Sequence, residues 1–167
     1  MEIIIGILSS FIASIVFLQF LIRLRPNIEI SPYISYGDNN GNFRIKIINR
    51  SKRDAINLKY ELSIVTPVNV PNGTVSNYKT LKLKKDNAFE IKGFDKSDTS
   101  AGYAKRIVTS ENLYNMWNDE KGNYLVFRMI VTDSLSGFHK VFRREFHTKR
   151  NVIVKGSHVF GNSLEVK

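Results

Sequence analysis

Residues 3 to 22 read IIIGILSSFIASIVFLQFLI, an apolar run without a charge or a proline. An α-helix rises about 1.5 Å per residue, so a run of this length spans roughly 30 Å, the thickness of the hydrocarbon core of a bilayer. The run follows Met1-Glu2 and leads into Arg23-Leu24-Arg25. It therefore lacks the basic start and the small-residue cleavage site of a secretory signal. The sequence predicts a retained transmembrane helix within residues 1–25, in preference to a cleaved signal peptide.

Basic residues flank the cytoplasmic end of membrane helices, and this asymmetry sets their orientation. Arg23 and Arg25 follow the apolar run, whereas Glu2 is the only charge before it. We therefore expect Met1 to lie outside and residues 26–167 to lie in the cytoplasm.

Small residues share one arc of about 140° on the expected helix. They are Gly6, Ser9, Ser10, Ala13 and Ser14. Stripes of this kind let membrane helices pack closely, and serines can also line a wet path. One helix cannot enclose a path, so conduction would require an oligomer with this face inward. The alternative is that small residues are simply common in membrane helices.

After Pro26 the pattern changes to an alternation of apolar and polar residues, which is typical of half-buried strands. The runs that predict strands are 28–35, 43–47, 57–64, 78–84, 89–91, 138–146 and 152–154, together with the nearly continuous apolar run 124–132, which predicts a central strand. Residues 38–41 predict a turn, and residues 66–77 and 92–102 predict loops. The predicted fold of residues 26–167 is therefore mainly β, an antiparallel β-sandwich of about seven or eight strands.

One short helix is predicted between these strands. Ser110 is the expected N-cap, and Leu113, Met116 and Trp117 follow at helical spacing. We expect this apolar face to belong to the core and to close one end of the sheets.

Composition excludes several classes of protein. Cysteine is absent, so there is no disulfide scaffold and no thiolate metal site. No phosphate-binding loop or acid–base constellation stands out, and we expect neither an enzyme nor a cofactor or metal site. The three histidines, His139, His147 and His158, are expected to be solvated in a basic strand, because no clustered carboxylates accompany them.

The soluble part is strongly basic. Counted from Arg23 to Lys167, it holds 25 Lys and Arg against 14 Asp and Glu, since Glu2 is the only charged residue that comes earlier, and its net charge is +11. Such a domain is attracted to an anionic leaflet or to a phosphate-bearing ligand. The residues expected to bind phosphate are Lys52, Arg53, Lys140, Arg143, Arg144, Lys149 and Arg150, with a further cluster at Lys82, Lys84 and Lys85. Phe138, Phe142 and Phe146 interleave with the last group and are expected in the core rather than as stacking platforms.

Three stretches carry a resemblance to a known family: Ile3 to Ile22, FRIKIINRS at 43–51, and FRMIVTDSLSGFHKVFRREF at 127–146. A single N-terminal helix followed by a small basic β-sandwich resembles the single-pass transmembrane effectors of bacterial anti-phage defence, most of all the channel-type effector of the Hailong system. The resemblance implies a homo-tetramer in the bacterial inner membrane, closed by single-stranded DNA that a partner nucleotidyltransferase makes. The cytoplasmic domains of inward-rectifier potassium channels are similar in plan, but this chain lacks their two-helix pore and filter loop.

Two functions are expected from these observations. The first is a membrane effector that oligomerises into a channel or pore controlled by single-stranded DNA or another nucleotide on the basic domain. The alternative is a membrane-tethered β-sandwich that binds a protein partner and conducts nothing.

Overall fold

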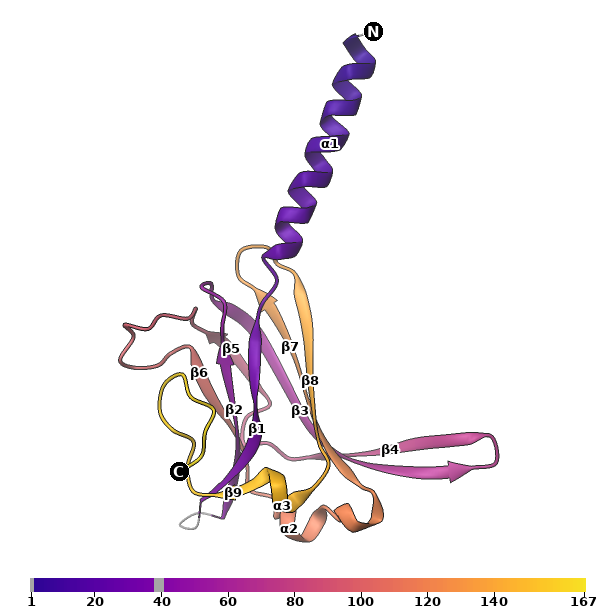
Figure 1. Ribbon diagram of the computed structural model, residues 1–167, viewed down its shortest axis with the longest axis vertical. Helices are drawn as coiled ribbons and strands as arrows, with labels where there is room; N and C mark the ends of the chain where they lie inside the picture. The colour runs from indigo at the N-terminus through magenta and orange to yellow at the C-terminus, as the bar shows by residue number, and fades with distance from the viewer. Residues whose placement is uncertain (1, 38–40) are drawn as a thin grey trace.

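The computed structural model describes residues 2–37 and 41–167, so the turn expected at 38–41 lies, except for Gly41, outside the described residues. The chain forms one long helix, α1 (Glu2–Arg23), and two β-sheets. Helix α1 stands out from one end of the sheets in Figure 1, and its side chains from Ile3 onward are almost all exposed. Residues Ile3–Arg23 have a mean hydropathy of 2.4, and the helix is long and apolar enough to span a membrane.

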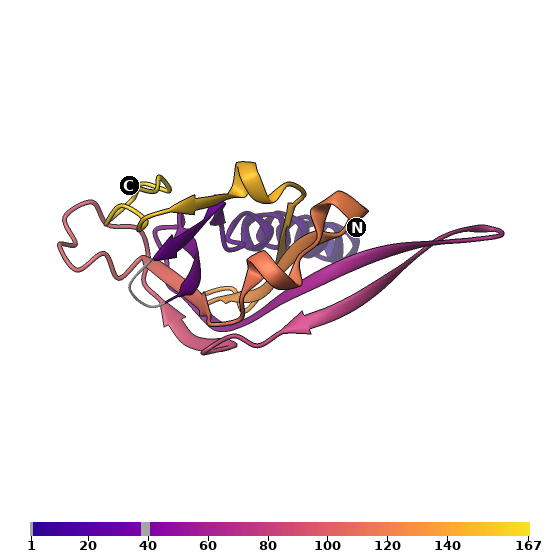
Figure 2. The ribbon, with the colours of Figure 1, turned by 90° about the horizontal axis from the view of Figure 1, so that it is seen from below.

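The two sheets confirm the predicted β-sandwich (Figures 1 and 2). One sheet has the strand order β6 (Ala104–Thr109), β2 (Asn42–Asn49), β1 (Ile28–Gly37) and β9 (Ile153–Lys155). The other has the order β4 (Gly73–Leu81), β3 (Ala55–Val70), β7 (Tyr124–Asp133) and β8 (His139–Phe146), with β5 (Asn87–Ile91) also paired to β3.

Two details of the sheets differ from the prediction. Strand β6 was not predicted, because Ala104-Lys105-Arg106 places two cations ahead of its two buried residues, Ile107 and Thr109. Strand β9 pairs with β1 in parallel, whereas every other pair of strands is antiparallel.

The core lies between the sheets. Strand β7 is central, as predicted: it lies between β3 and β8, and Leu125, Val126 and Phe127 are fully buried. Trp117 is also fully buried, and its indole N–H donates to the carbonyl oxygen of Asn123 at 2.8 Å. Burying such a large side chain beside α2 closes the end of the sandwich opposite α1 (Figure 1).

Three short helical segments are present among the described residues, where one was predicted. They are α2 (Leu113–Met116), η1 (Asp119–Lys121) and α3 (Lys149–Val152). The prediction of Ser110 as N-cap of α2 is wrong. Asn112 is the cap, and its side chain accepts hydrogen bonds from the main-chain N–H groups of Tyr114 and Asn115.

The loop predicted at 66–77 is instead a β-hairpin that projects sideways from the sandwich, and we call these residues the hairpin arm (Figures 1 and 2). Prolines suggested a loop because proline lacks an N–H for a central strand. Pro67, however, lies beyond Val65, the last β3 residue paired with β7, so only β4 flanks it, where Pro67 pairs with Ser76. A proline is tolerated where one edge of its strand is open.

The segment after β9 folds back over the first sheet. Lys46, only 2% exposed, donates through Nζ to the carbonyl oxygens of Val159, Gly161 and Ser163 at 2.6, 2.6 and 2.7 Å. The same segment buries His158, so the expectation that this histidine is solvated is wrong. Its Nε2 lies 3.1 Å from Ser31 Oγ, in a site that the linear sequence gives no means of anticipating.

Candidate functional site at the joint between helix and sandwich

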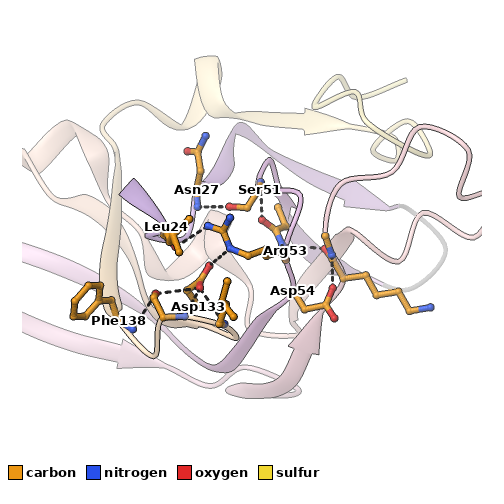
Figure 3. Close-up of polar contacts among 12 residues, drawn as sticks. Leu24, Asn27, Ser51, Arg53, Asp54, Asp133 and Phe138 are labelled. Carbon is orange, nitrogen blue, oxygen red and sulfur yellow. Dashed lines mark hydrogen bonds and ion pairs between the residues drawn. The ribbon is translucent and has the colours of Figure 1, made fainter. Parts of the chain in front are cut away.

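The last turn of α1 is held by the sandwich. The carbonyl groups of a helix C-terminus lack partners within the helix and carry partial negative charge. Arg53, in the turn between β2 and β3, donates through Nη2 to the carbonyl oxygen of Leu24 at 2.8 Å (Figure 3). A cation at this end of a helix satisfies the carbonyl and complements the helix dipole.

Asp133, at the end of β7, fixes the guanidinium of Arg53. Its Oδ2 accepts from Arg53 Nε at 3.1 Å, and its Oδ1 accepts from the N–H groups of Leu135 and Ser136 and from the hydroxyl of Ser136 (Figure 3). The Asp133 side chain is 1% exposed. Burial raises the pKa of this carboxyl, but the hydrogen bonds from Ser136 and Arg53 outweigh that effect and hold it below its usual value. Asp133 is therefore ionised at neutral pH and paired with Arg53.

A second contact joins the same elements. The N–H of Asn27, between α1 and β1, donates to Ser51 Oγ at 2.8 Å, and the carbonyl oxygen of Asn27 accepts from the N–H of Arg50 at 2.7 Å. We call Leu24, Asn27, Ser51, Arg53 and Asp133 the helix–sandwich joint. The joint ties α1 to the β2–β3 turn and, through Asp133, to the β7–β8 hairpin.

The loop after β5 supports the joint from the other side. Asp54 Oδ1 accepts from the N–H of Gly93 at 2.7 Å. A Cβ at Gly93 would overlap the carbonyl oxygen of Lys52, so only glycine allows the segment after β5 to approach the β2–β3 turn this closely.

The small residues of α1 lie uncovered. Gly6, Ser9, Ser10, Ala13 and Ser14 are all exposed. The hydroxyl of Ser9 donates to the carbonyl oxygen of Gly6 at 2.9 Å, and that of Ser14 to the carbonyl oxygen of Ser10 at 2.8 Å. These two hydroxyls are satisfied within their own helix, so the small-residue face can enter hydrocarbon or a close helix contact.

The residues predicted to hold phosphate do not form one cluster. Lys52 and Arg53 lie at the α1 end of the sandwich, whereas Lys149 and Arg150 belong to α3 at the opposite end (Figure 1). Two nitrogens of Arg53 donate within the joint. Lys149 Nζ donates to the carbonyl oxygen of Tyr114 and lies 3.7 Å from Asp119.

The other three residues predicted to bind phosphate, Lys140, Arg143 and Arg144, all lie on β8 but do not share one face. Arg143 pairs with Glu145 on the outer face, whereas Arg144 reaches across to the carbonyl oxygen of Ile30 in the other sheet. Neighbouring residues of a strand point to opposite faces, so Arg143 and Arg144 cannot grip one ligand together. Lys140 lies 4.8 Å from the ring of Phe142.

The other aromatic and histidine predictions for this strand fare better. Phe146 is buried and Phe142 packs against the core, as predicted, whereas Phe138, next to the turn, is only half-buried and belongs to neither core cluster. His139 and His147 are exposed, in line with the prediction.

Asp133 is the site residue that sequence reasoning missed. Its signal was present, because an aspartate at the first position of a turn is typical when its side chain caps the following N–H groups. The stretch Asp133-Ser-Leu-Ser-Gly137 has this pattern, but its partner Arg53 lies 80 residues earlier.

Comparison with known proteins gives distant similarity only. No family model matches the chain, and no curated protein does. Among the solved structures that match is the crystal structure of the periplasmic chaperone SfaE, with a TM-score of 0.42 and 7% sequence identity, covering 77% of this chain and 56% of that one. The chain thus spans little more than half the length of this chaperone.

Proposed function

We propose that this protein is a membrane effector whose helix α1 self-associates into a channel or pore and whose β-sandwich gates that assembly in response to an anionic ligand. The observation that carries the proposal is the helix–sandwich joint. A helix serving only as an anchor needs no specific contact with its domain, whereas here Arg53, held by the buried carboxylate of Asp133, donates to the main chain at Leu24, directly after α1.

The joint supports gating because it sits between the two parts that gating must connect. A ligand shifts an equilibrium between closed and open assemblies only if it binds them with different affinity. Displacing the β2–β3 turn or the β7–β8 hairpin would alter the position of Arg53 against Leu24 and so the tilt of α1.

The uncovered face from Gly6 to Ser14 supports self-association, because small residues permit close approach of membrane helices. The resemblance to anti-phage effectors makes a tetramer in the bacterial inner membrane the assembly we propose. It also makes single-stranded DNA, or another nucleotide from a partner nucleotidyltransferase, the ligand. The sandwich, with the excess of basic residues, is then cytoplasmic and Met1 external.

Ion flux from vesicles containing the purified protein tests the channel. The variant Ser10→Leu/Ser14→Leu fills the small-residue face and is expected to abolish flux. The matched control Phe11→Leu/Ile15→Leu keeps the same spacing of leucines on another face and is expected to conduct normally. Equal flux from both variants and the wild type would remove the case for this face.

The joint is tested in the same vesicles with Arg53→Gln. We expect assembly to survive and the response to ligand to be lost, because the helix is no longer held to Asp133. Lys96→Gln removes an exposed charge outside the joint and outside the predicted phosphate-binding residues, and should leave the response intact.

A second candidate, the membrane-tethered adaptor, is favoured by the hairpin arm. No charged residue occurs between Glu61 and Lys79. Val68, Val70 and Val75 lie on the arm with 40%, 41% and 51% of their surface exposed. Two-stranded hairpins are marginally stable alone in water, so an uncharged arm of this kind suits contact with another protein. The adaptor predicts normal partner binding in the Ser10→Leu/Ser14→Leu variant and no flux from any variant.

A further inference from the structure

A pocket of about 260 Å³ opens beside β6, away from the helix–sandwich joint. Its lining comprises Tyr60, Lys84, Lys85, Asn87, Lys105, Arg106, Ile107 and Val108. Three lysines line it, Lys84, Lys85 and Lys105, and no acidic residue does; Arg106, the next residue after Lys105 on β6, directs its guanidinium to the main-chain oxygen of His158. We propose that this pocket binds the phosphoryl group of a small phosphorylated molecule.

The main chain holds the pocket open in a fixed shape. The N–H of Lys84 donates to the carbonyl oxygen of Val108 at 2.8 Å, and Leu83 forms a β-bridge with Thr109. On the other side, the N–H of Tyr60 donates to the carbonyl oxygen of Asp86 at 2.7 Å. Residues 83–86 are thereby clamped between β6 of one sheet and β3 of the other, so the lysines they carry are positioned before any ligand arrives.

Like charges crowd this pocket. Burial lowers the pKa of Lys105, the positive charge of Lys85 lowers it further, and Glu90 opposes the shift only in part. Lys105 Nζ donates to the main-chain oxygen of Glu90, and Arg106 donates one nitrogen to the main-chain oxygen of His158. The main-chain contact does not neutralise Lys105, so an entering anion relieves the repulsion between Lys85 and Lys105.

A buried tyrosine hydroxyl provides the second, independent observation. Tyr60 is 7% exposed and lines the pocket, yet its hydroxyl has no hydrogen-bond partner among the described residues. Burial raises the pKa of Tyr60, so the hydroxyl keeps its proton and remains a donor. An unpaired buried hydroxyl destabilises a fold unless it has another purpose, and a phosphate oxygen in the pocket would accept from it.

Size and charge select the ligand. One water occupies about 30 Å³ of liquid, so the pocket has room for a phosphate or diphosphate group and not for a polymer. Lysine ammonium groups bind phosphate as point charges, and three of them suit a group with at least two negative charges. A free phosphorylated metabolite and the terminal phosphate of a nucleotide offer the same chemistry.

Calorimetric titration of the full chain in detergent with inorganic pyrophosphate tests the pocket. Lys85→Gln and Lys105→Gln are each expected to weaken binding about tenfold, the loss of one charge-assisted contact. The matched controls Lys79→Gln and Lys121→Gln remove the same charge at exposed positions outside the pocket and should change affinity less than about twofold. Equal losses in all four variants would overturn the proposal, since binding would then follow net charge alone.

Tyr60→Phe gives a readout that simple attraction between charges would not move. This variant should fold with unchanged or greater thermal stability, because an unpaired hydroxyl is removed, and should bind pyrophosphate several-fold more weakly. Unaltered affinity in Tyr60→Phe would overturn the assigned site. Comparing 5′-AMP with pyrophosphate then separates the two sources: tighter binding of 5′-AMP identifies a nucleotide, and tighter binding of pyrophosphate identifies a free phosphorylated metabolite.

Only the effect of a bound phosphate on channel opening rests on the proposed function; the binding itself does not. If pyrophosphate binds and neither the wild-type protein nor any variant conducts, the proposed phosphate site is supported and the proposed channel is refuted. If vesicles with the wild-type protein conduct and no pyrophosphate binds, the proposed phosphate site is refuted and the proposed channel is supported.

Discussion

Lys46 Nζ lies 2.6 Å from the carbonyl oxygen of Gly161, which joins the middle of β2 to a segment more than one hundred residues later. Burial lowers the pKa of Lys46 to about 8, with a further contribution from the charge of Arg106. The ammonium is thus still mostly protonated at neutral pH, and the carbonyl oxygens of Val159, Gly161 and Ser163 take the place of its hydration shell.

Lys46→Met should lower the free energy of unfolding by about 3 kcal/mol, because three carbonyl groups lose a charged donor. Urea denaturation followed by the fluorescence of Trp117, the sole tryptophan, measures this change. Lys59→Met, which alters an exposed lysine of β3, should cost less than about 0.5 kcal/mol. Equal stability of the two variants would mean that Lys46 contributes no more than a surface lysine.

Acid should destabilise the sandwich through His158. Burial lowers the pKa of this histidine to about 4, and the charges of Lys46, Arg106 and Arg44 add to the shift. Between pH 6.5 and 4 this histidine is protonated in the unfolded state but neutral in the folded state. The free energy of unfolding therefore falls as the pH falls through this window, by up to about 3 kcal/mol. His158→Gln should flatten the stability profile between these pH values, whereas the exposed His139→Gln should keep the wild-type slope.

Asn112→Ala should lower stability by about 1 kcal/mol, because the first turn of α2 loses the side chain that accepts from two of its N–H groups. Thermal denaturation reports the change. Ser110→Ala, at the position that the sequence pattern suggested as the cap, should leave the melting temperature unaltered. A reversed order of the two effects would restore Ser110 as the cap.

Gly93→Ala should destabilise the protein by about 2 kcal/mol or more, because its Cβ would meet the main chain at Lys52, which cannot move without disturbing Arg53. Gly37→Ala offers a comparison, since the nearest atom there is the end of the flexible Arg44 side chain. We expect Gly37→Ala to cost less than half as much in the same urea titration.

Local patterns in the sequence were enough to predict the long helix and most of the strands. The apolar run from Ile3 to Ile22 and the alternation in β1, β2 and β3 depend only on side chains within a few positions of one another. They therefore gave the β-sandwich and the central position of β7.

The features that escaped prediction depend on residues that are distant in sequence. Whether Pro67 can lie in a strand depends on where β7 begins, at Tyr124 opposite Val65, and whether His158 is solvated depends on the path of the chain over β1. The joint was missed for the same reason, since nothing in the sequence around Arg53 or Asp133 indicates that the two residues form a pair. The excess of cationic residues was recognised from the sequence. Their grouping was not, because strand alternation and the distance between the two ends of the sandwich place them on several surfaces.

The parallel pairing of β9 with β1 has a consequence for the order of events during synthesis. Ile34 pairs with Ile153, so the edge of β1 stays open until more than one hundred further residues have been made, which at about 5–20 residues per second takes roughly ten seconds. During that interval α1 leaves the ribosome, while Lys46 still lacks its three carbonyl acceptors. Two nascent chains anchored side by side would then each present an unpaired strand edge to the other. The late pairing of β9 therefore leaves time in which the β9 of one copy could pair with the β1 of a neighbouring copy.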